Sequence, residues 1–327
     1  MTKQANKSGT FRALHSPVAV IGYGNQGRAQ ALNLRDSGID VHIGVRLDGK
    51  SAQLAKQDNF KPQSISEVVA SCEVLMLLVP DEVMGDIYRS AILTTTNLER
   101  KAIGFAHGFA IHYKLINPTT AGDVFMVSPK GTGETLRANY LSKVGLPSYI
   151  AVAQDCTGRA RDLALAYADA IGCTAQGTYI TSFQEETECD LFSEQTVLCG
   201  PIGQLIKTSF DVLVESGVSP QLAYFECLTE AKLVCDLLVA GGGFDNFHQK
   251  ISNTAEYGGY LANEKILPSD LKGRMLSVWQ HIKQGKFAAE FIADYENGFK
   301  QLNSLRAKYS KHPLDKVAAD VQASKSC

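Results

Sequence analysis

Two pairs of carboxylates, each spaced four residues apart, are the most chemically informative feature of the sequence. Asp190 and Glu194 form the first pair, and Glu226 and Glu230 form the second. Both pairs stand in otherwise apolar, helix-like sequence, where residues four apart share a face. Carboxylates on an inward helix face are costly unless a cation neutralises them. Mg²⁺ binds a few carboxylates and keeps several waters, so the spacing favours a magnesium site; the alternative is two solvated helix faces.

A glycine-rich loop near the start of the chain predicts dinucleotide binding. An apolar, strand-like run at residues 17–21 is followed by a helical pattern at 28–37, and between them lies G-Y-G-N-Q-G, which comprises Gly22, Tyr23, Gly24, Asn25, Gln26 and Gly27. The first glycine permits the tight turn, the second lets the backbone approach a pyrophosphate, and the third lets the helix pack on the strand. The helix N-terminus then offers amide hydrogens and a positive dipole to the phosphates.

The end of the second predicted strand, residues 41–45, distinguishes between the two nicotinamide cofactors. Arg46 stands where an NAD-binding protein places an acidic residue, and Lys50 and Ser51 follow closely. Arginine binds phosphate oxygens in bidentate fashion, which favours the 2′-phosphate of NADPH. Asp48 in the same loop argues the other way, because its charge would repel that phosphate. We therefore expect NADPH, and NADH is not excluded.

Short apolar strands alternate with helical segments through residue 183, which predicts a Rossmann-like parallel sheet covered on both faces. Ligands of such sheets bind beyond the carboxyl ends of the strands. The residues that directly follow a strand, and are therefore expected at the nucleotide crevice, are Pro80, Asp81, His107, Gly108 and Lys130. A histidine or lysine at such a position is also a common structural or turn residue.

From residue 184 the periodicity becomes helical, which predicts a second domain. We expect a dinucleotide-binding domain over residues 1–183 and an all-helical domain over residues 184–327 that carries the metal and substrate residues and forms the dimer. Residues 308–327 are polar and are expected to fray. Ser252, in the polar run I-S-N-T-A-E-Y-G, is interpreted either as a helix cap or as a contact to a substrate carboxylate.

Composition and charge narrow the class of protein. The 327 residues are 45% hydrophobic and 20% charged, as in a soluble globular protein of about two domains. The 32 basic and 34 acidic residues nearly cancel, so no nucleic-acid partner is expected. No apolar run reaches about 18 residues and no signal peptide is evident, so we expect no membrane partner and a cytoplasmic location. The eight cysteines form no C-x-x-C pair and are expected to be buried free thiols.

These motifs together resemble ketol-acid reductoisomerases (acetohydroxyacid isomeroreductases) of the short, bacterial-type class, with some divergence. The matching runs cover residues 17 to about 305 and include G-Y-G-N-Q-G, F-A-H-G-F, P-K-G, E-T-E-C-D-L-F-S-E-Q and A-Y-F-E-C-L-T-E-A-K-L. The resemblance implies that Asp190, Glu194, Glu226 and Glu230 hold two Mg²⁺ ions, the last two residues coming from the partner subunit of a homodimer or higher homo-oligomer. It also implies a knotted helical domain interlocked between two subunits.

The activity implied by the resemblance belongs to branched-chain amino-acid biosynthesis. The substrate, 2-acetolactate or 2-aceto-2-hydroxybutyrate, undergoes Mg²⁺-dependent alkyl migration and then accepts hydride from NADPH, giving a 2,3-dihydroxy-3-methyl acid. His107, Lys130 and Glu230 would be catalytic, with Glu230 assisting proton movement and Lys130 orienting a metal-bound water. Ser252 would contact the substrate.

The sequence departs from the family pattern at five positions. Ala110 stands where the family usually has asparagine, and Thr132 and Glu134 stand where it usually has proline and histidine. Pro201 replaces a glycine, and Thr229 replaces a histidine. A divergent reductoisomerase for a related 2-hydroxy-3-keto acid is therefore one alternative. A metal-free β-hydroxyacid dehydrogenase and an NADPH-binding sensor without turnover are two others. The preferred alkyl group and the oligomer size beyond a dimer do not follow from the sequence.

Overall fold

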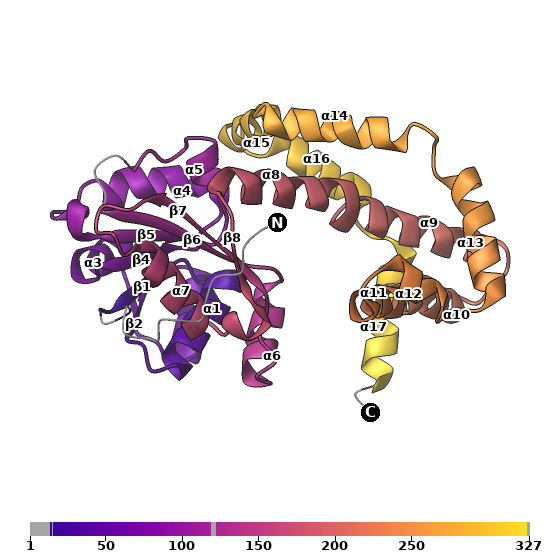
Figure 1. Ribbon diagram of the computed structural model, residues 1–327, viewed down its shortest axis with the longest axis horizontal. Coiled ribbons are helices and arrows are strands. Elements are labelled where there is room, and N and C mark those ends of the chain that lie inside the picture. The colour runs from indigo at the N-terminus through magenta and orange to yellow at the C-terminus, as the bar shows by residue number, and fades with distance from the viewer. Residues whose placement is uncertain (1–13, 15, 119–121, 326–327) are drawn as a thin grey trace. The chain divides into compact units, whose positions relative to one another are not determined.

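The computed structural model describes residue 14, residues 16–118 and residues 122–325. The chain divides into two compact units, the first ending at Cys189 and the second beginning at Asp190 (Figure 1). This division falls inside helix α8 (Phe183–Ser193), which begins where the sequence pattern changes from strands to helices.

Over the described residues, eight strands form one sheet in the order β3-β2-β1-β4-β5-β6-β7-β8. The strands from β1 to β6 run parallel, as the Rossmann-like pattern predicts. Their bounds are β1 (Val18–Ile21), β2 (Val41–Gly44), β3 (Pro62–Gln63), β4 (Val74–Leu77), β5 (Ala102–Phe105), β6 (Asp123–Pro129), β7 (Ser148–Gln154) and β8 (Thr178–Ile180). The chain order reverses at β1, and dinucleotides bind at such a switch point.

Strand β7 pairs antiparallel with β6, which the sequence pattern did not predict. The register places Pro129 opposite Ser148, so helix α6 (Gly133–Leu141) returns the chain to the edge of the sheet where β6 ended instead of crossing a face. The backbone N–H of Lys130 donates to the carbonyl of Pro147 at 2.8 Å. Lys130 therefore lies between the end of β6 and helix α6, and its backbone is bonded to the residue before β7.

Helices cover both faces of the sheet, and strand residues alternate between two cores. Val18 and Val20 of β1 face one core, whereas Ala19 and Ile21 face the other. Because both faces are covered, the central strands β1, β4 and β5 carry no polar side chain. The helices of this unit are α1 (Asn25–Asp36), α2 (Lys50–Gln57), α3 (Ile65–Ser71), α4 (Asp81–Ile87), α5 (Phe109–His112), α6 and α7 (Ala160–Ala170), with short turns η2 (Tyr88–Ile92), η3 (Leu98–Arg100) and η4 (Thr174–Gln176).

The second unit is helical throughout its described residues. After α8 come η5 (Glu194–Leu198), α9 (Pro201–Glu215), α10 (Pro220–Tyr224), η6 (Phe225–Thr229), α11 (Glu230–Gly241), α12 (Phe244–His248), α13 (Asn253–Ile266), α14 (Leu271–Lys283), α15 (Lys286–Glu296), α16 (Lys300–Tyr309) and α17 (Pro313–Lys325). The expectation of a frayed tail is wrong. Helix α17 buries Leu314 and Val321 in a small core with Phe210 and Tyr224.

The helical run from Phe183 to Glu215 is long and apolar enough to cross a membrane by length and composition alone, a test that core helices of soluble proteins also pass. The expectation that the protein has no membrane partner stays a prediction. The described cysteines are free, as expected, but only Cys72 and Cys173 are buried.

Candidate active site

The glycine-rich loop has the geometry that dinucleotide binding requires. Gly22 has a φ of +100°, and a Cβ there would lie 2.5 Å from the carbonyl oxygen of Leu78. A Cβ on Gly27 would lie 2.2 Å from the carbonyl oxygen of Gly22, which is the close helix–strand packing expected of the third glycine. Around Gly24 no atom lies within 4 Å of such a Cβ. The backbone at the N-terminus of α1 is therefore open to a phosphate group.

Tyr23 has a structural role within this loop. Its ring packs edge-on against Phe60, and its hydroxyl donates a hydrogen bond to Asp58 at 2.9 Å. Arg28 donates to both oxygens of the same carboxylate. Burial, followed by the hydrogen bond to Asp58, raises the pKa of Tyr23. The side chain is buried, so only the backbone of Tyr23 is placed to contact a dinucleotide, and that contact stays a prediction.

The polar residues predicted to select the cofactor lie together after β2. Arg46, Asp48 and Lys50 are exposed, and α2 begins at Lys50 with Ser51 in its first turn. After β4, which lies on the other side of β1 from β2, Pro80 is the N-cap of α4 and Asp81 lies in its first turn. These positions fit the predicted crevice, and their contacts to a cofactor stay predictions.

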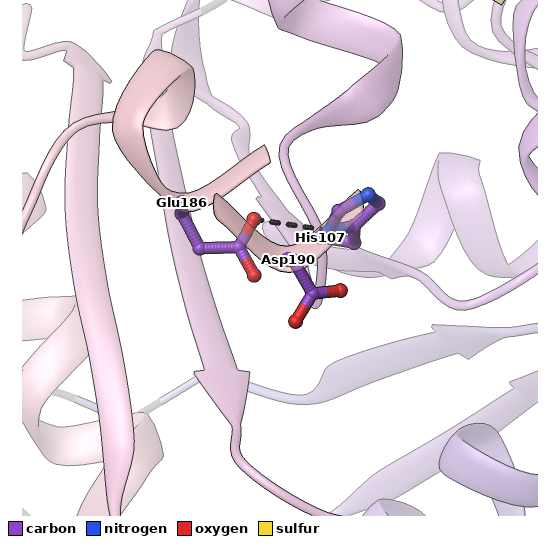
Figure 2. Close-up of side chains that lie close together, drawn as sticks. All are labelled: His107, Glu186 and Asp190. Atoms are coloured by element: carbon purple, nitrogen blue, oxygen red, sulfur yellow. Dashed lines mark ion pairs between the residues drawn. The ribbon is translucent and has the colours of Figure 1, made fainter. Parts of the chain in front are cut away.

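Glu186 occupies the centre of a polar cluster with His107, which follows β5, and Lys130, which follows β6. Figure 2 shows Glu186 beside His107 and Asp190. Glu186 Oε1 accepts hydrogen bonds from the Ser128 hydroxyl at 2.7 Å and from Lys130 Nζ at 2.9 Å. Its Oε2 accepts from the backbone N–H of Gly108 at 3.1 Å and lies 3.0 Å from His107 Nδ1 in an ion pair. The Glu186 side chain is only 1% exposed. The structure thus joins His107 and Lys130 through a carboxylate that the sequence analysis did not select.

The electrostatics of Glu186 follow from these partners. Burial alone would raise its pKa, but His107, Lys130 and Ser128 outweigh burial and lower the pKa to about 2. Glu186 therefore remains ionised at neutral pH.

Helix α8 continues from Glu186 to Asp190, one turn further on. The potential ligand atoms of His107, Glu186 and Asp190 all lie within 4.8 Å of one another (Figure 2). In the part of the chain that the structure describes, this is the one group of three or more such residues. Neither Glu226 nor Glu230 belongs to it, and both are exposed. A single chain therefore does not bring the four predicted metal ligands together.

Both carboxylate pairs adjoin a π turn. Glu194 begins η5, in which the N–H of Cys199 donates to the carbonyl of Glu194. Glu226 lies inside η6, and Glu230 follows it directly. Such turns are rare, and they often occur at functional sites.

The second face of α8 is also fixed to the sheet domain. Glu188 Oε1 lies 3.2 Å from His112 Nε2 and accepts a hydrogen bond from Gln184. Burial lowers the pKa of His112, although Glu188 opposes this effect. A Cβ on Gly108 would lie 2.3 Å from Thr187 Oγ1. The helix that carries Glu186 is therefore closely packed against the loop that carries His107.

Ser252 and the five departures from the family pattern each have a local structural role. Ser252 caps α13, because its Oγ accepts from the N–H of Ala255 at 3.2 Å; its contact with substrate stays a prediction. Ala110 is buried in a core of the sheet domain, and Thr132 caps α6, with Glu134 in the first turn. Pro201 begins α9, and Thr229 ends η6.

Comparison with known proteins adds independent findings. Residues 14–177 match the domain family described as acetohydroxy acid isomeroreductase, NADPH-binding domain. Residues 183–326 match the family described as ketol-acid reductoisomerase, C-terminal domain. An NADH-preferring ketol-acid reductoisomerase from an uncultured archean is 38% identical, with a TM-score of 0.92 and coverage of 99% of each chain.

More distant structures share the fold alone. An NAD-binding semialdehyde dehydrogenase protein from Cupriavidus necator is 18% identical, with a TM-score of 0.62 over 85% of this chain and 98% of that chain. A pyrroline-5-carboxylate reductase from Coxiella burnetii is 11% identical, with a TM-score of 0.59 over 82% and 98%.

Proposed function

The chain belongs to the ketol-acid reductoisomerase family, NAD(P)-dependent enzymes of branched-chain amino-acid biosynthesis, and we propose that it converts 2-acetolactate and 2-aceto-2-hydroxybutyrate to 2,3-dihydroxy-3-methyl acids. The cluster around Glu186 carries this proposal. It joins His107 and Lys130 at the carboxyl edge of the sheet, one helical turn before Asp190. The polar groups thus lie on the side of the sheet where the dinucleotide loop begins.

The chemistry of the carboxylates fits magnesium, which prefers oxygen ligands. We propose that Asp190 and Glu194 of one subunit, with Glu226 and Glu230 of its partner, hold two Mg²⁺ ions. When bound, the ions supply Lewis-acid stabilisation of negative charge on the substrate oxygens. Glu186 is not assigned as a ligand, because both of its oxygens already accept from protein groups.

The remaining polar groups are assigned to proton movement and orientation. Glu186 holds the ammonium group of Lys130, which also lies 5.4 Å from the centre of the Tyr149 ring. This fixed positive charge can orient a water or a substrate oxygen at the edge of the sheet. Glu230 assists transfer of the substrate hydroxyl proton, and Ser252 binds the substrate carboxylate.

NADPH is the proposed reductant. The exposed side chains of Arg46 and Lys50, with Ser51, supply cationic and hydroxyl groups for a 2′-phosphate. The relative from the uncultured archean prefers NADH, so the ratio of kcat/KM for the two cofactors is the measurement that decides this point.

The second unit is proposed to form a homodimer or higher homo-oligomer in the cytoplasm. It exposes large apolar side chains, including Val239 at 84%, Tyr257 at 68% and Phe244 at 67%. Extensive apolar surface of this kind marks an interface, and a second copy that contributes Glu226 and Glu230 would cover it. The interlocked, knotted arrangement is part of this proposal.

NADPH oxidation by the purified protein tests the function. With 2-acetolactate and Mg²⁺ we expect turnover on the order of 10 s⁻¹, abolished by EDTA and restored by Mg²⁺. Turnover that survives EDTA would instead support a metal-free dehydrogenase. NADPH binding without oxidation, across several 2-hydroxy-3-keto acids, would support a sensor. Turnover of a related acid but not of 2-acetolactate would indicate a divergent reductoisomerase.

A further inference from the structure

The turn that carries Lys130 is in direct contact with the dinucleotide loop. Gln26 Nε2 donates a hydrogen bond to the carbonyl oxygen of Gly131 at 2.9 Å. A Cβ on Gly133 would lie 2.0 Å from the carbonyl oxygen of Asn25, so the two backbones touch with no room for a side chain between them. A displacement of either loop must therefore be transmitted to the other.

Two buried residues extend this contact into the core. Gln30 Nε2 donates to Gln26 Oε1 at 3.0 Å, and the Tyr167 hydroxyl donates to Gln30 Oε1 at 2.8 Å. Gln30 and Tyr167 are both 0% exposed. Buried polar side chains are costly unless they are hydrogen-bonded. Here the hydrogen bonds form a continuous chain from the Tyr167 hydroxyl to the carbonyl oxygen of Gly131.

The donor-to-acceptor direction of this hydrogen-bond chain is fixed by its last acceptor, the carbonyl oxygen of Gly131. A carbonyl oxygen only accepts, so Gln26 must turn its NH₂ group toward Gly131 and its oxygen toward Gln30. Gln30 must then present its NH₂ group to Gln26 and its oxygen to Tyr167, whose hydroxyl must donate. Each amide is therefore held in one of its two possible orientations.

We propose that Tyr167, Gln30 and Gln26 form a polarised relay that positions the Lys130–Gly131 turn against the dinucleotide loop. The three are positioning residues for the reaction, acting through the backbone beside Lys130. The inference rests on the proposed role of Lys130 in catalysis. It adds a reason for the buried glutamine in the middle of helix α1, which neither the dinucleotide motif nor the metal site requires.

Three variants of the complete protein test the relay. Gln26→Met and Gln30→Met remove the amide groups with little change of volume, and Tyr167→Phe removes only the first donor. We expect kcat to fall about tenfold in the two methionine variants, because a small misplacement of a reacting group is costly. A smaller fall is expected in Tyr167→Phe. The NADPH dissociation constant of Gln30→Met and Tyr167→Phe, measured by fluorescence without Mg²⁺, should change less than about twofold, because both residues lie outside the dinucleotide loop, whose backbone amides bind the phosphates.

Asn33→Leu is the matched control. Asn33 is also buried on α1, but its amide bonds to the carbonyl of Ile171 and to Arg137, not to Gly131. We expect it to lower the melting temperature, as Gln30→Met does, while kcat stays near the wild-type value. Equal kcat losses in Asn33→Leu and Gln30→Met would overturn the relay, as would an unchanged kcat in Gln26→Met.

A second measurement does not depend on turnover. Amide hydrogen exchange of a peptide covering residues 129–136 should accelerate in Gln26→Met and Gln30→Met but not in Asn33→Leu. Unchanged exchange in both methionine variants would overturn the relay even if the wild-type protein has no activity. Absence of wild-type activity, with the expected exchange pattern, would instead contradict the proposed function.

Discussion

At the scale of single residues, Glu186 is the buried negative charge that holds His107 and Lys130 in the candidate site. Glu186→Gln replaces one acceptor oxygen by an NH₂ group, which must then face at least one of the donors that the carboxylate accepts from now. We expect kcat to fall by at least about 100-fold and the protein to lose about 1–3 kcal/mol of unfolding free energy. Steady-state kinetics and denaturant unfolding measure the two effects.

Glu185→Gln is the control for this change. Glu185 is the exposed neighbour on α8 and accepts a hydrogen bond from Thr181. Its amide variant should retain both kcat and stability. If Glu186→Gln behaved in the same way, Glu186 would not hold Lys130 and His107 in the functional state.

Arg46 tests the cofactor proposal. Arg46→Ala removes a charged donor to the 2′-phosphate, so the KM for NADPH should rise about tenfold or more while the KM for NADH stays nearly constant. Lys56→Ala, near the far end of α2, should change neither value. An equal effect of Arg46→Ala on both cofactors would mean that Arg46 does not read the phosphate.

Asp58 gives a prediction for pH dependence. The hydrogen bonds from Arg28 lower the pKa of Asp58, although burial opposes them and Tyr23 adds to the lowering. A lowered folded-state pKa means that ionised Asp58 stabilises the fold above the ordinary aspartate value of about 3.9. That contribution is lost as the pH falls through the lowered folded-state value.

Asp58→Asn should therefore cost about 1 kcal/mol at neutral pH, and the difference from wild type should shrink as the pH falls below about 4. Urea unfolding at several pH values measures it. A difference that is constant from pH 7 to pH 3 would show that the charge of Asp58 is not the source of the stability.

The residues also show how far sequence reasoning could reach. The four-residue spacing that identified Asp190 and Glu194 extends back one turn to Glu186, so the same rule could have found it. The run E-E-T-E at 185–188 obscured this signal, because three glutamates in four positions do not indicate which side chains are buried. Tyr23 was assigned by its motif alone, whereas its burial depends on Phe60 and Asp58, which lie far away in the sequence.

At the scale of elements, the continuous apolar strands and the glycine motif were sufficient to predict the parallel part of the sheet. The antiparallel β7 was not predictable, because periodicity does not reveal whether α6 crosses a face or returns to the same edge. The tail was misread from its polarity. Leu314, Val317 and Val321 have helical spacing, and this stripe packs on the core of the second unit.

Helix α17 therefore supports a prediction of its own. Leu314→Ala should lower the unfolding free energy by about 2–5 kcal/mol, because it leaves a cavity beside Phe210. Lys316→Ala, at an exposed position of the same helix, should change it little. Thermal unfolding of both variants measures the difference, and equal melting temperatures would mean that α17 does not pack on this core in solution.

At the scale of the whole molecule, the proposed assembly rests on the exposed apolar surface of the second unit. The sequence implied this only through its resemblance to the family, because no pattern within one chain reveals which carboxylates come from a partner. The structure of one chain gathers His107, Glu186 and Asp190 but leaves Glu226 and Glu230 outside that group. The central claim is therefore that two subunits share each metal site.

Mixed dimers test this claim most directly. Chains carrying Asp190→Asn and chains carrying Glu226→Gln, with different affinity tags, would be co-expressed and the mixed dimers purified. Each variant alone should lose nearly all Mg²⁺-dependent NADPH oxidation. In a two-fold dimer with shared sites, one of the two sites escapes both changes, so the mixed dimer should recover about half of the wild-type kcat. Mixed dimers as inactive as the two parent variants would contradict the shared site.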